Sequence, residues 1–281
     1  MTDSSTEVIL ADQSRGNQKP YQNIGEVSCP SALIVGLDLT GSMQYAPNGR
    51  SLYEIQKESF GLALRQINEN CSSSSGTIKN RVFFAALGVT DGAPKTVLPF
   101  ASAAENLERM KNGEFDLPAT PTCPGTDHVA FLNKATEYFR HKPTLSKGKR
   151  LSSFNVVLLI SDGGHNVSDE EDVIAAAEEL KSIYAEDGIS KTLIMTVFVG
   201  HSNESADITN FSGVANPEQI EDEEERLMAR IASEVPEELI KGRIRDLAPN
   251  LRAGSKMMLS GGADVMKVAL GFIAAASSKR V

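Results

Sequence analysis

Three short runs of apolar residues, separated by segments with helical periodicity, are the feature that most constrains the fold of this chain. The runs cover residues 31–38, 154–160 and 192–199. A run of this length without polar alternation is typical of a strand that is buried on both faces. Strands of this kind that alternate with helices predict a doubly wound, mostly parallel α/β sheet with helices on both faces.

The segments between and after these runs complete the alternation. Residues 51–70 carry Phe60, Ala63, Leu64 and Ile67 at offsets of 0, 3, 4 and 7, which is the apolar stripe of a helix. Pro99 marks a strand at 96–100 as an edge strand or a strand end, because proline cannot donate to a sheet ladder. Further helices are predicted over 102–111, 127–140, 168–186 and 263–276, and further strands over 81–89 and 257–259, the latter a short edge strand.

Two of these helices begin with the pattern of a capping box, in which a serine is followed three residues later by a glutamate. The two pairs are Ser102 with Glu105 and Ser168 with Glu171. In a capping box the serine hydroxyl and the glutamate carboxylate each accept a hydrogen bond from a backbone N–H group of the first turn. We therefore expect a helix to begin at each serine.

The chain divides into a tail and one domain. Residues 1–28 are polar and lack periodicity, which predicts a flexible N-terminal tail. Residues 29–281 form the α/β domain. Within it, residues 201–255 hold a polar loop and two helical patterns, over 223–235 and 237–247, and are interpreted as a helical insertion before the last strand and helix. The alternative is an extra pair of helices packed on the domain.

Composition restricts the classes of partner. The formal net charge of −9 argues against a general nucleic-acid binder, which needs a basic face. The N-terminus has no apolar segment typical of a signal peptide, and no stretch approaches the roughly 20 apolar residues of a membrane span. The three cysteines, Cys29, Cys71 and Cys123, are widely spaced, which favours free thiols in a reducing compartment. We therefore expect a cytoplasmic protein without a nucleic-acid partner and without a membrane span.

Polar residues that are suited to a metal follow the first apolar run. Asp38, Thr40 and Ser42 stand at alternate positions just past its end. One carboxylate and two hydroxyls are hard oxygen ligands, the type that Mg²⁺ prefers, with Mn²⁺ and Ca²⁺ as the other choices. The alternative for such residues at a strand-to-helix turn is a helix N-cap.

Two further oxygen-bearing residues favour the metal. Thr126 stands at the start of a predicted helix, and Asp162 follows the apolar run over 154–160. Since ligands of doubly wound sheets bind beyond the carboxyl ends of the strands, these residues are predicted to meet Asp38 at one edge. Asp91 stands in a similar Thr-Asp-Gly context, but Asp-Gly between two strands indicates a hairpin turn.

The set of motifs resembles the metal-ion-dependent adhesion site of von Willebrand factor A domains. That family has Asp-x-Ser/Thr-x-Ser, then a threonine, then an aspartate in a Thr/Ser-Asp-Gly context, as in residues 38–42, 125–126 and 161–163. The resemblance implies that Ser42 ligates the metal directly together with Thr40 or Thr126. It implies that Asp38 and Asp162 act partly through water. The incomplete shell would then take an Asp or Glu from a partner protein.

The residues beside these ligands are the predicted partner contacts. They are Gly41, Met43, Gln44, Gly125, Asp127, Gly163 and His165. Residues 44–50 form a longer loop than the family pattern has, which is interpreted as a longer turn or as part of the partner surface. The segment 263–276 is similar to the last helix of standalone bacterial members of tellurium-resistance type. This likeness implies a partner among ATPases, kinases or phosphatases in a stress-response or assembly complex.

Two other functions use the same residues. A metal-dependent hydrolase or phosphatase would add His128 or His165, although these histidines and His201 lack metal-ligand spacing and are expected in surface loops. A phosphatase of the haloacid dehalogenase type would have a second aspartate where this chain has Thr40. A structural subunit of a large particle would carry a degenerate site. The preferred reading is a binding module and not an enzyme.

Overall fold

The computed structural model describes most of the predicted domain. The described ranges are 32–46, 49–72, 83–141, 155–184, 191–200, 211–237, 239–240, 245–246 and 248–276. The tail predicted over 1–28 and the loop over 201–210 lie outside these ranges.

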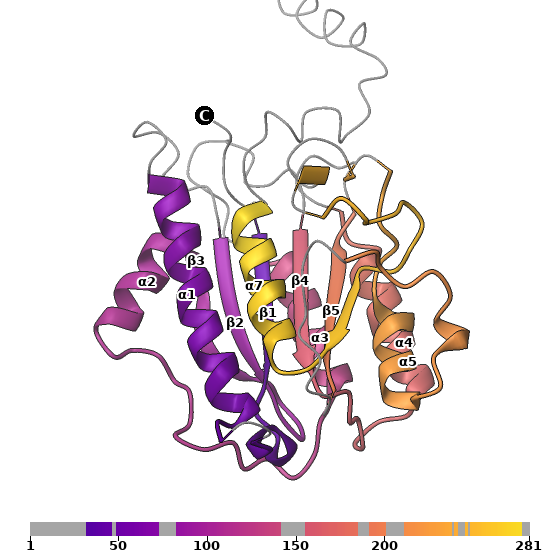
Figure 1. Cartoon of the computed structure of the whole chain (residues 1–281). Coiled ribbons are helices and arrows are strands. Elements are labelled where there is room, and N and C mark those ends of the chain that lie inside the picture. The colour runs from indigo at the N-terminus through magenta and orange to yellow at the C-terminus, as the bar shows by residue number, and fades with distance from the viewer. Residues whose placement is uncertain are drawn as a thin grey trace, which may run out of the picture.

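A six-stranded sheet lies at the centre of the domain, with the strand order β3-β2-β1-β4-β5-β6 (Figure 1). Neighbouring strands are parallel except β2 and β3, which form an antiparallel hairpin at one edge. This arrangement confirms the predicted doubly wound, mostly parallel α/β fold and its two edge strands. The strands are β1 (Ala32–Asp38), β2 (Phe83–Val89), β3 (Lys95–Ser102), β4 (Asn155–Ser161), β5 (Leu193–Val199) and β6 (Met258–Gly261).

Helices cover both faces of the sheet (Figure 1). One layer holds α1 (Leu52–Ser72), α2 (Ala103–Lys111) and α7 (Asp264–Ala276), and the other holds α3 (His128–Arg140), α4 (Glu170–Lys181) and α5 (Glu223–Ile231). Along β1, Leu33 and Val35 belong to the core under α1 and α7, whereas Ala32 and Ile34 belong to the core under α3 to α5. Because both faces of the strand are buried, its sequence is an unbroken apolar run. No described helix combines the length and the apolar character that crossing a bilayer requires.

The segment predicted as a helical insertion contributes one helix to the second layer. α5 connects β5 to β6 and buries Leu227, Met228 and Ile231 against the sheet and α4. The helix predicted over 237–247 is not helical at its start, because residues 237, 239 and 240 form a turn in which the Leu239 N–H donates to the Pro236 carbonyl. Residues 238, 241–244 and 247 lie outside the described ranges.

The two predicted capping boxes have different outcomes. Ser102 caps α2 as predicted: its hydroxyl accepts a hydrogen bond from the Glu105 N–H at 3.2 Å, and the Glu105 carboxylate accepts one from the Ser102 N–H. Ser168 does not cap α4, which begins at Glu170 and ends at Lys181, before the predicted end at 186. The Ser168 hydroxyl instead donates to the Asp127 carboxylate at 3.4 Å.

This difference predicts unequal costs for two matched substitutions. Ser102→Ala should lower the free energy of unfolding by about 1 kcal/mol, the usual cost of a lost N-cap. Ser168→Ala should cost only a few tenths of a kcal/mol, since its hydrogen bond is long and caps no helix. Urea unfolding of both variants measures the difference. An equal loss of unfolding free energy in Ser102→Ala and Ser168→Ala would contradict the conclusion that only Ser102 caps a helix.

Candidate metal centre

Three loops meet at the carboxyl ends of β1 and β4, where the sequence predicts the metal site. The loop after β1 is joined to the loop before α3 by the Thr40–Cys123 bridge and by a 3.0 Å hydrogen bond from the Gly41 N–H to the Cys123 carbonyl. The loop after β4 is joined to the loop before α3 by Asn166, whose side-chain oxygen accepts a 2.9 Å hydrogen bond from the Thr126 N–H. These bonds bring the predicted ligands to one edge of the sheet.

Asp38, the last residue of β1, lies completely buried at the base of this site. Its Oδ1 accepts hydrogen bonds from the Thr40 N–H at 2.8 Å and from the Thr40 hydroxyl at 2.6 Å, and its Oδ2 accepts one from the Ser161 hydroxyl at 2.7 Å. Gln56 of α1 fixes the Asp38 backbone by accepting from its N–H and donating to its carbonyl. Asp38 therefore holds the Thr40 side chain in place. The Thr40 hydroxyl makes no cap hydrogen bond to the following turn, η2 (Gly41–Gln44).

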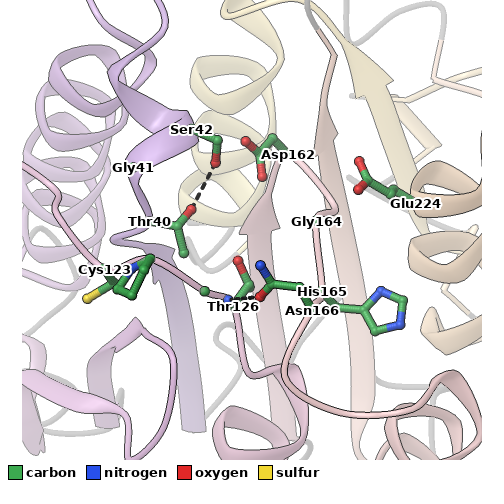
Figure 2. A pocket seen from close by; sticks show the side chains of 12 residues that line it. Thr40, Gly41, Ser42, Cys123, Thr126, Asp162, Gly164, His165, Asn166 and Glu224 are labelled. Atoms are coloured by element: carbon green, nitrogen blue, oxygen red, sulfur yellow. Dashed lines mark hydrogen bonds between the residues drawn. The ribbon is translucent and has the colours of Figure 1, made fainter.

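Four of the five predicted ligands, Thr40, Ser42, Thr126 and Asp162, line a pocket of about 350 Å³, whereas the buried Asp38 does not line it. Figure 2 shows the side chains of Ser42, Thr126 and Asp162 pointing toward one space, with the Thr40 and Ser42 hydroxyl oxygens 3.0 Å apart. Since Thr40 donates its hydroxyl hydrogen to Asp38, the oxygen of Thr40 retains lone pairs that can accept. Three hydroxyl oxygens and one carboxylate thus converge, which is a set of hard ligands.

One oxygen of the buried Asp162 carboxylate has no hydrogen-bond partner among the described residues. Asp162 is 7% exposed, and the unpartnered atom is Oδ1. Burial, and after it the charge of Asp162, raise the pKa of Asp38 from 3.8 to about 6. Two neighbouring buried carboxylates are costly unless a positive charge compensates them. The residues present therefore fit a divalent cation that prefers oxygen, such as Mg²⁺.

Hydroxyl groups would have to supply part of the shell of that cation. In the described part of the chain, no group of three or more His, Cys, Asp or Glu side chains is placed so that it could hold a metal ion. A site of two carboxylates and several hydroxyls leaves a dication with less compensating charge than a carboxylate-rich site does. Such an ion attracts a further anionic ligand.

Of the predicted partner contacts, Gly41, Gly125 and His165 line the pocket. Gln44 is exposed, and its amide donates a 2.6 Å hydrogen bond to the Pro121 carbonyl.

Three of the predicted partner contacts lie elsewhere. The structure corrects the prediction for Met43, which is completely buried in the core under α1. In a 3-10 turn successive side chains point about 120° apart, so Met43 faces inward where Ser42 faces the pocket. Asp127 caps α3 by accepting from the Ala130 N–H, and Gly163 is a buried residue of the loop after β4 that does not line the pocket.

Of the histidines expected in surface loops, His128 differs from the prediction, whereas His165 lies half-buried in the loop after β4. His128 is completely buried, and burial, followed by the charge of His165, lowers its pKa to about 3. Its Nε2 lies 3.4 Å from the Ser161 hydroxyl, and its ring stacks on His165 with centroids 6.2 Å apart. His128 therefore stays neutral inside the fold and does not line the pocket. His201 lies outside the described residues.

Asp91 and Cys123, the two other residues considered near the site, lie in a turn and carry a free thiol, respectively. Asp91 lies in the turn between β2 and β3, which confirms the hairpin interpretation. Cys123 is a free thiol, and its pKa is raised by burial first and then by the charge of Asp91. A raised pKa lowers the fraction of thiolate, so Cys123 is poorly suited to act as a nucleophile.

Three residues of the site were not among the predicted ones. Ser161 donates to Asp38, Asn166 joins two of the loops, and Glu224 of α5 lines the pocket. Gly125 allows the approach of Asn166, because a Cβ atom at Gly125 would lie 2.7 Å from the Asn166 side-chain oxygen. Ser161 belongs to the Ser161-Asp162-Gly163 motif, so its role could have been predicted from the sequence. No sequence pattern indicates Asn166 or Glu224, whose places at the site follow from the folded structure.

Neither a family model nor a curated protein matches the sequence. Solved structures of similar fold include a von Willebrand factor type A protein from Catenulispora acidiphila, which is 15% identical over 86% of this chain and 42% of that one, with a TM-score of 0.43. The manganese-loaded TRAP protein of Plasmodium vivax is 17% identical over 87% of this chain and 73% of that one, with a TM-score of 0.44.

A third similar structure is the proximal thread matrix protein 1 of the mussel byssus with zinc in its MIDAS motif. It is 15% identical over 88% of this chain, with a TM-score of 0.46, and this chain spans 48% of its length. The chain thus spans about half the length of this protein and of the Catenulispora protein.

Proposed function

We propose that this chain is a domain of von Willebrand factor A type whose pocket holds one divalent cation and uses it to bind a carboxylate of a partner protein. The observation that carries the proposal is the unpartnered Oδ1 of the buried Asp162 beside the buried carboxylate of Asp38. Asp162 faces the hydroxyl groups of Thr40, Ser42 and Thr126 in one pocket. The order of these residues along the chain matches the adhesion-site pattern.

Each residue has a distinct part in the proposed site. Ser42, Thr40 or Thr126 and Asp162 would hold the cation, which would supply positive charge for an anionic ligand. Asp38 lies below and orients Thr40 and Ser161 through its two oxygens. Asn166 keeps Thr126 in place through the backbone N–H. No bond needs to break for this activity, so the site would work as a binding module.

The finer assignments extend this proposal. Mg²⁺ is the preferred ion, because it keeps several waters and needs few protein ligands. We place the protein in a cytoplasmic complex for stress response or assembly, with an ATPase, kinase or phosphatase as neighbour. The support for this placement is the similarity of residues 263–276 to standalone bacterial members of tellurium-resistance type. The burial of His128 and its low pKa argue against hydrolysis that uses His128.

Titration calorimetry with Mg²⁺ tests the proposal on a matched pair of variants. Asp162→Asn should weaken Mg²⁺ binding at least about tenfold, since it removes a charged ligand. Asp91→Asn, which changes the other Asp-Gly motif outside the pocket, should leave binding within about twofold of the wild type. Equal binding by all three proteins would contradict the proposed site.

A turnover assay tests the alternative function, a metal-dependent hydrolase or phosphatase. The wild type should release no phosphate from p-nitrophenyl phosphate with Mg²⁺ or Mn²⁺ above the rate of an Asp38→Ala variant. Hydrolysis that depends on metal and is lost in Asp38→Ala would instead establish the hydrolase.

A further inference from the structure

A second pocket, of about 630 Å³, lies at the end of the sheet opposite to the metal centre. It is lined by Thr192 and Leu193, where β5 begins, whereas the metal centre lies where the parallel strand β4 ends. Three lysines line this pocket, and we therefore name it the lysine pocket; they are Lys181, Lys191 and Lys256. Lys181 is the last residue of α4, Lys191 comes just before β5, and Lys256 comes just before β6. The lysine pocket thus joins three segments that are far apart in the sequence.

The charge of the lysine pocket is opposite in sign to that of the whole chain. Its three lysines are joined by two glutamates, Glu178 and Glu234, which leaves one positive charge in excess, whereas the chain has a net charge of −9. A helix C-terminus favours a basic residue, which accounts for Lys181 at the end of α4. It does not account for the other two lysines, which come from segments outside the helices. The pocket therefore gathers more positive charge than the end of α4 explains.

Two of the three lysine side chains are largely enclosed. The side chain of Lys181 is 14% exposed, and that of Lys256 is 22% exposed. Burial lowers the pKa of the Lys181 ammonium group; Glu178 opposes this shift, and the charge of Lys256 adds to it. The two ammonium groups are thus close enough to repel each other. Enclosed charges of like sign are costly unless an opposite charge compensates them, so this arrangement favours an anion in the pocket.

The two glutamates that pair with these lysines face the solvent. Glu178 accepts from the Lys181 ammonium at 2.8 Å, and Glu234 accepts from the Lys256 ammonium at 3.4 Å. The side chains of the two glutamates are 65% and 67% exposed. An ion pair with a partner that faces water contributes little free energy, so an anion inside the pocket can take the place of either glutamate.

The third lysine stands beside an exposed aromatic ring. Among the described residues, no carboxylate pairs with Lys191, and its ammonium group lies 5.9 Å from the centroid of the Tyr184 ring. Tyr184 lines the pocket and is 52% exposed. Ligand sites in proteins typically combine a concave shape, an aromatic or apolar wall and a few convergent polar groups. The lysine pocket has all three features, and its convergent groups are cationic.

We propose that the lysine pocket binds a small molecule that carries a diphosphate group, with the phosphate oxygens at Lys181, Lys191 and Lys256. An ammonium group is a compact point charge with rotatable donors, which suits phosphate oxygens. One phosphate group carries about 1.5 to 2 negative charges at pH 7, and a second phosphate group supplies charge for the third lysine. The diphosphate is either free pyrophosphate or part of a nucleotide whose base contacts Tyr184. This inference is independent of the metal centre and goes beyond the proposed function.

Titration calorimetry with pyrophosphate, inorganic phosphate and ADP tests the inference. The titrations are made in EDTA, which keeps the metal centre empty. Pyrophosphate should bind at least about tenfold tighter than inorganic phosphate, because a single phosphate group reaches fewer of the ammonium groups, and higher salt should weaken the binding. ADP identifies the source of the diphosphate: a nucleotide site should bind ADP tighter than pyrophosphate and lose this difference in Tyr184→Ala, whereas a site for free pyrophosphate should not prefer ADP.

Substitutions of lysine by methionine remove the charge and retain most of the length of the side chain. Lys181→Met and Lys256→Met should each weaken pyrophosphate binding about tenfold, since each removes a charged donor. Lys191→Met should also weaken it, and because Lys191 is exposed this variant keeps the test available if Lys181→Met does not fold.

Lys134→Met is the matched control. Lys134 of α3 pairs with Glu137 at the same spacing and the same distance of 2.8 Å as Lys181 pairs with Glu178. Its ammonium group also lies near a tyrosine ring, 5.3 Å from the centroid of Tyr138, but it does not line the lysine pocket. Pyrophosphate binding by Lys134→Met should stay within about twofold of the wild type.

Three results would overturn the inference. They are the absence of pyrophosphate binding at millimolar concentration, binding that the three lysine-pocket variants leave unchanged, and equal affinities for phosphate and pyrophosphate. The metal centre is tested separately, because Asp162→Asn should retain pyrophosphate binding in EDTA and Lys181→Met should retain Mg²⁺ binding. A failure of either proposal is therefore distinguishable from a failure of the other.

Discussion

Replacing Asp38 with Asn is expected to raise the free energy of unfolding of the metal-free protein at pH 8 by roughly 1–3 kcal/mol, although it removes a residue of the metal site. Burial first, and the charge of Asp162 second, raise the pKa of Asp38 from 3.8 to about 6. The folded protein therefore binds the proton more tightly than the unfolded chain does. Above pH 6 the ionised Asp38 costs stability, and this cost fades as the pH falls through about 6 toward 3.8.

Urea unfolding in EDTA at pH 8 and at pH 4 measures this effect. The gain from Asp38→Asn should be present at pH 8 and nearly absent at pH 4, where the carboxyl group is protonated in the folded protein. Saturating Mg²⁺ at pH 8 should reduce or cancel the gain, since an ion at about 100 times its Kd stabilises the wild type by about 2.7 kcal/mol and the variant by less. Asp91→Asn is the control, because Asp91 lies in the β2–β3 turn outside the pocket. A variant that is less stable than the wild type at pH 8 without metal would contradict this account of the buried charge.

Replacing Gly163 with Ala is expected to lower the free energy of unfolding by roughly 2–4 kcal/mol and to weaken metal binding. Gly163 has a φ of 91°, a conformation that costs an alanine energy. A Cβ atom there would also lie 2.7 Å from Cε2 of the buried Phe198 ring and 2.8 Å from the Cβ of Glu224. Relief of these contacts must move either α5 or the loop that carries Asp162.

Gly164→Ala provides the matched control one residue further along. A Cβ atom at Gly164 would lie 3.5 Å from the Glu224 Oε1 and 3.8 Å from the Asp162 Oδ1, which are ordinary contact distances. This variant should lose less than about 1 kcal/mol in urea unfolding and should keep its affinity for Mg²⁺ in calorimetry. Equal losses from the two substitutions would show that Gly163 has no special constraint.

The sheet could be predicted from the sequence because its central strands are buried on both faces. The unbroken apolar runs of β1, β4 and β5 leave few other folds, and the hairpin at Asp91 followed from its Asp-Gly turn. The capping box of Ser102 forms as predicted, because it depends only on residues of the same helix start. That of Ser168 did not form, because the Ser168 hydroxyl is held by Asp127, a residue of another helix start.

The metal centre was predictable to the extent that its residues follow strand ends. Asp38, Thr40, Ser42 and Asp162 lie at or just past the ends of β1 and β4, whereas Thr126 lies just before α3, and the parallel sheet brings these segments together. The position of Met43 depended on the 3-10 form of the turn, in which successive side chains point about 120° apart, so that Met43 faces the core and Ser42 the pocket. The roles of Asn166 and Glu224 depend on loops and a helix that meet only in the folded chain.

X-ray diffraction from crystals grown with MnCl₂, with data collected to locate the anomalous signal of manganese, tests the central claim most directly. The account predicts one manganese peak in the pocket of the wild type, in contact with the Ser42 hydroxyl and the Asp162 carboxylate. It predicts no such peak in Asp162→Asn crystals under the same conditions. A wild-type map without manganese in this pocket at saturating Mn²⁺ would contradict the proposal that Ser42 and Asp162, with Thr40 or Thr126, hold a cation above Asp38.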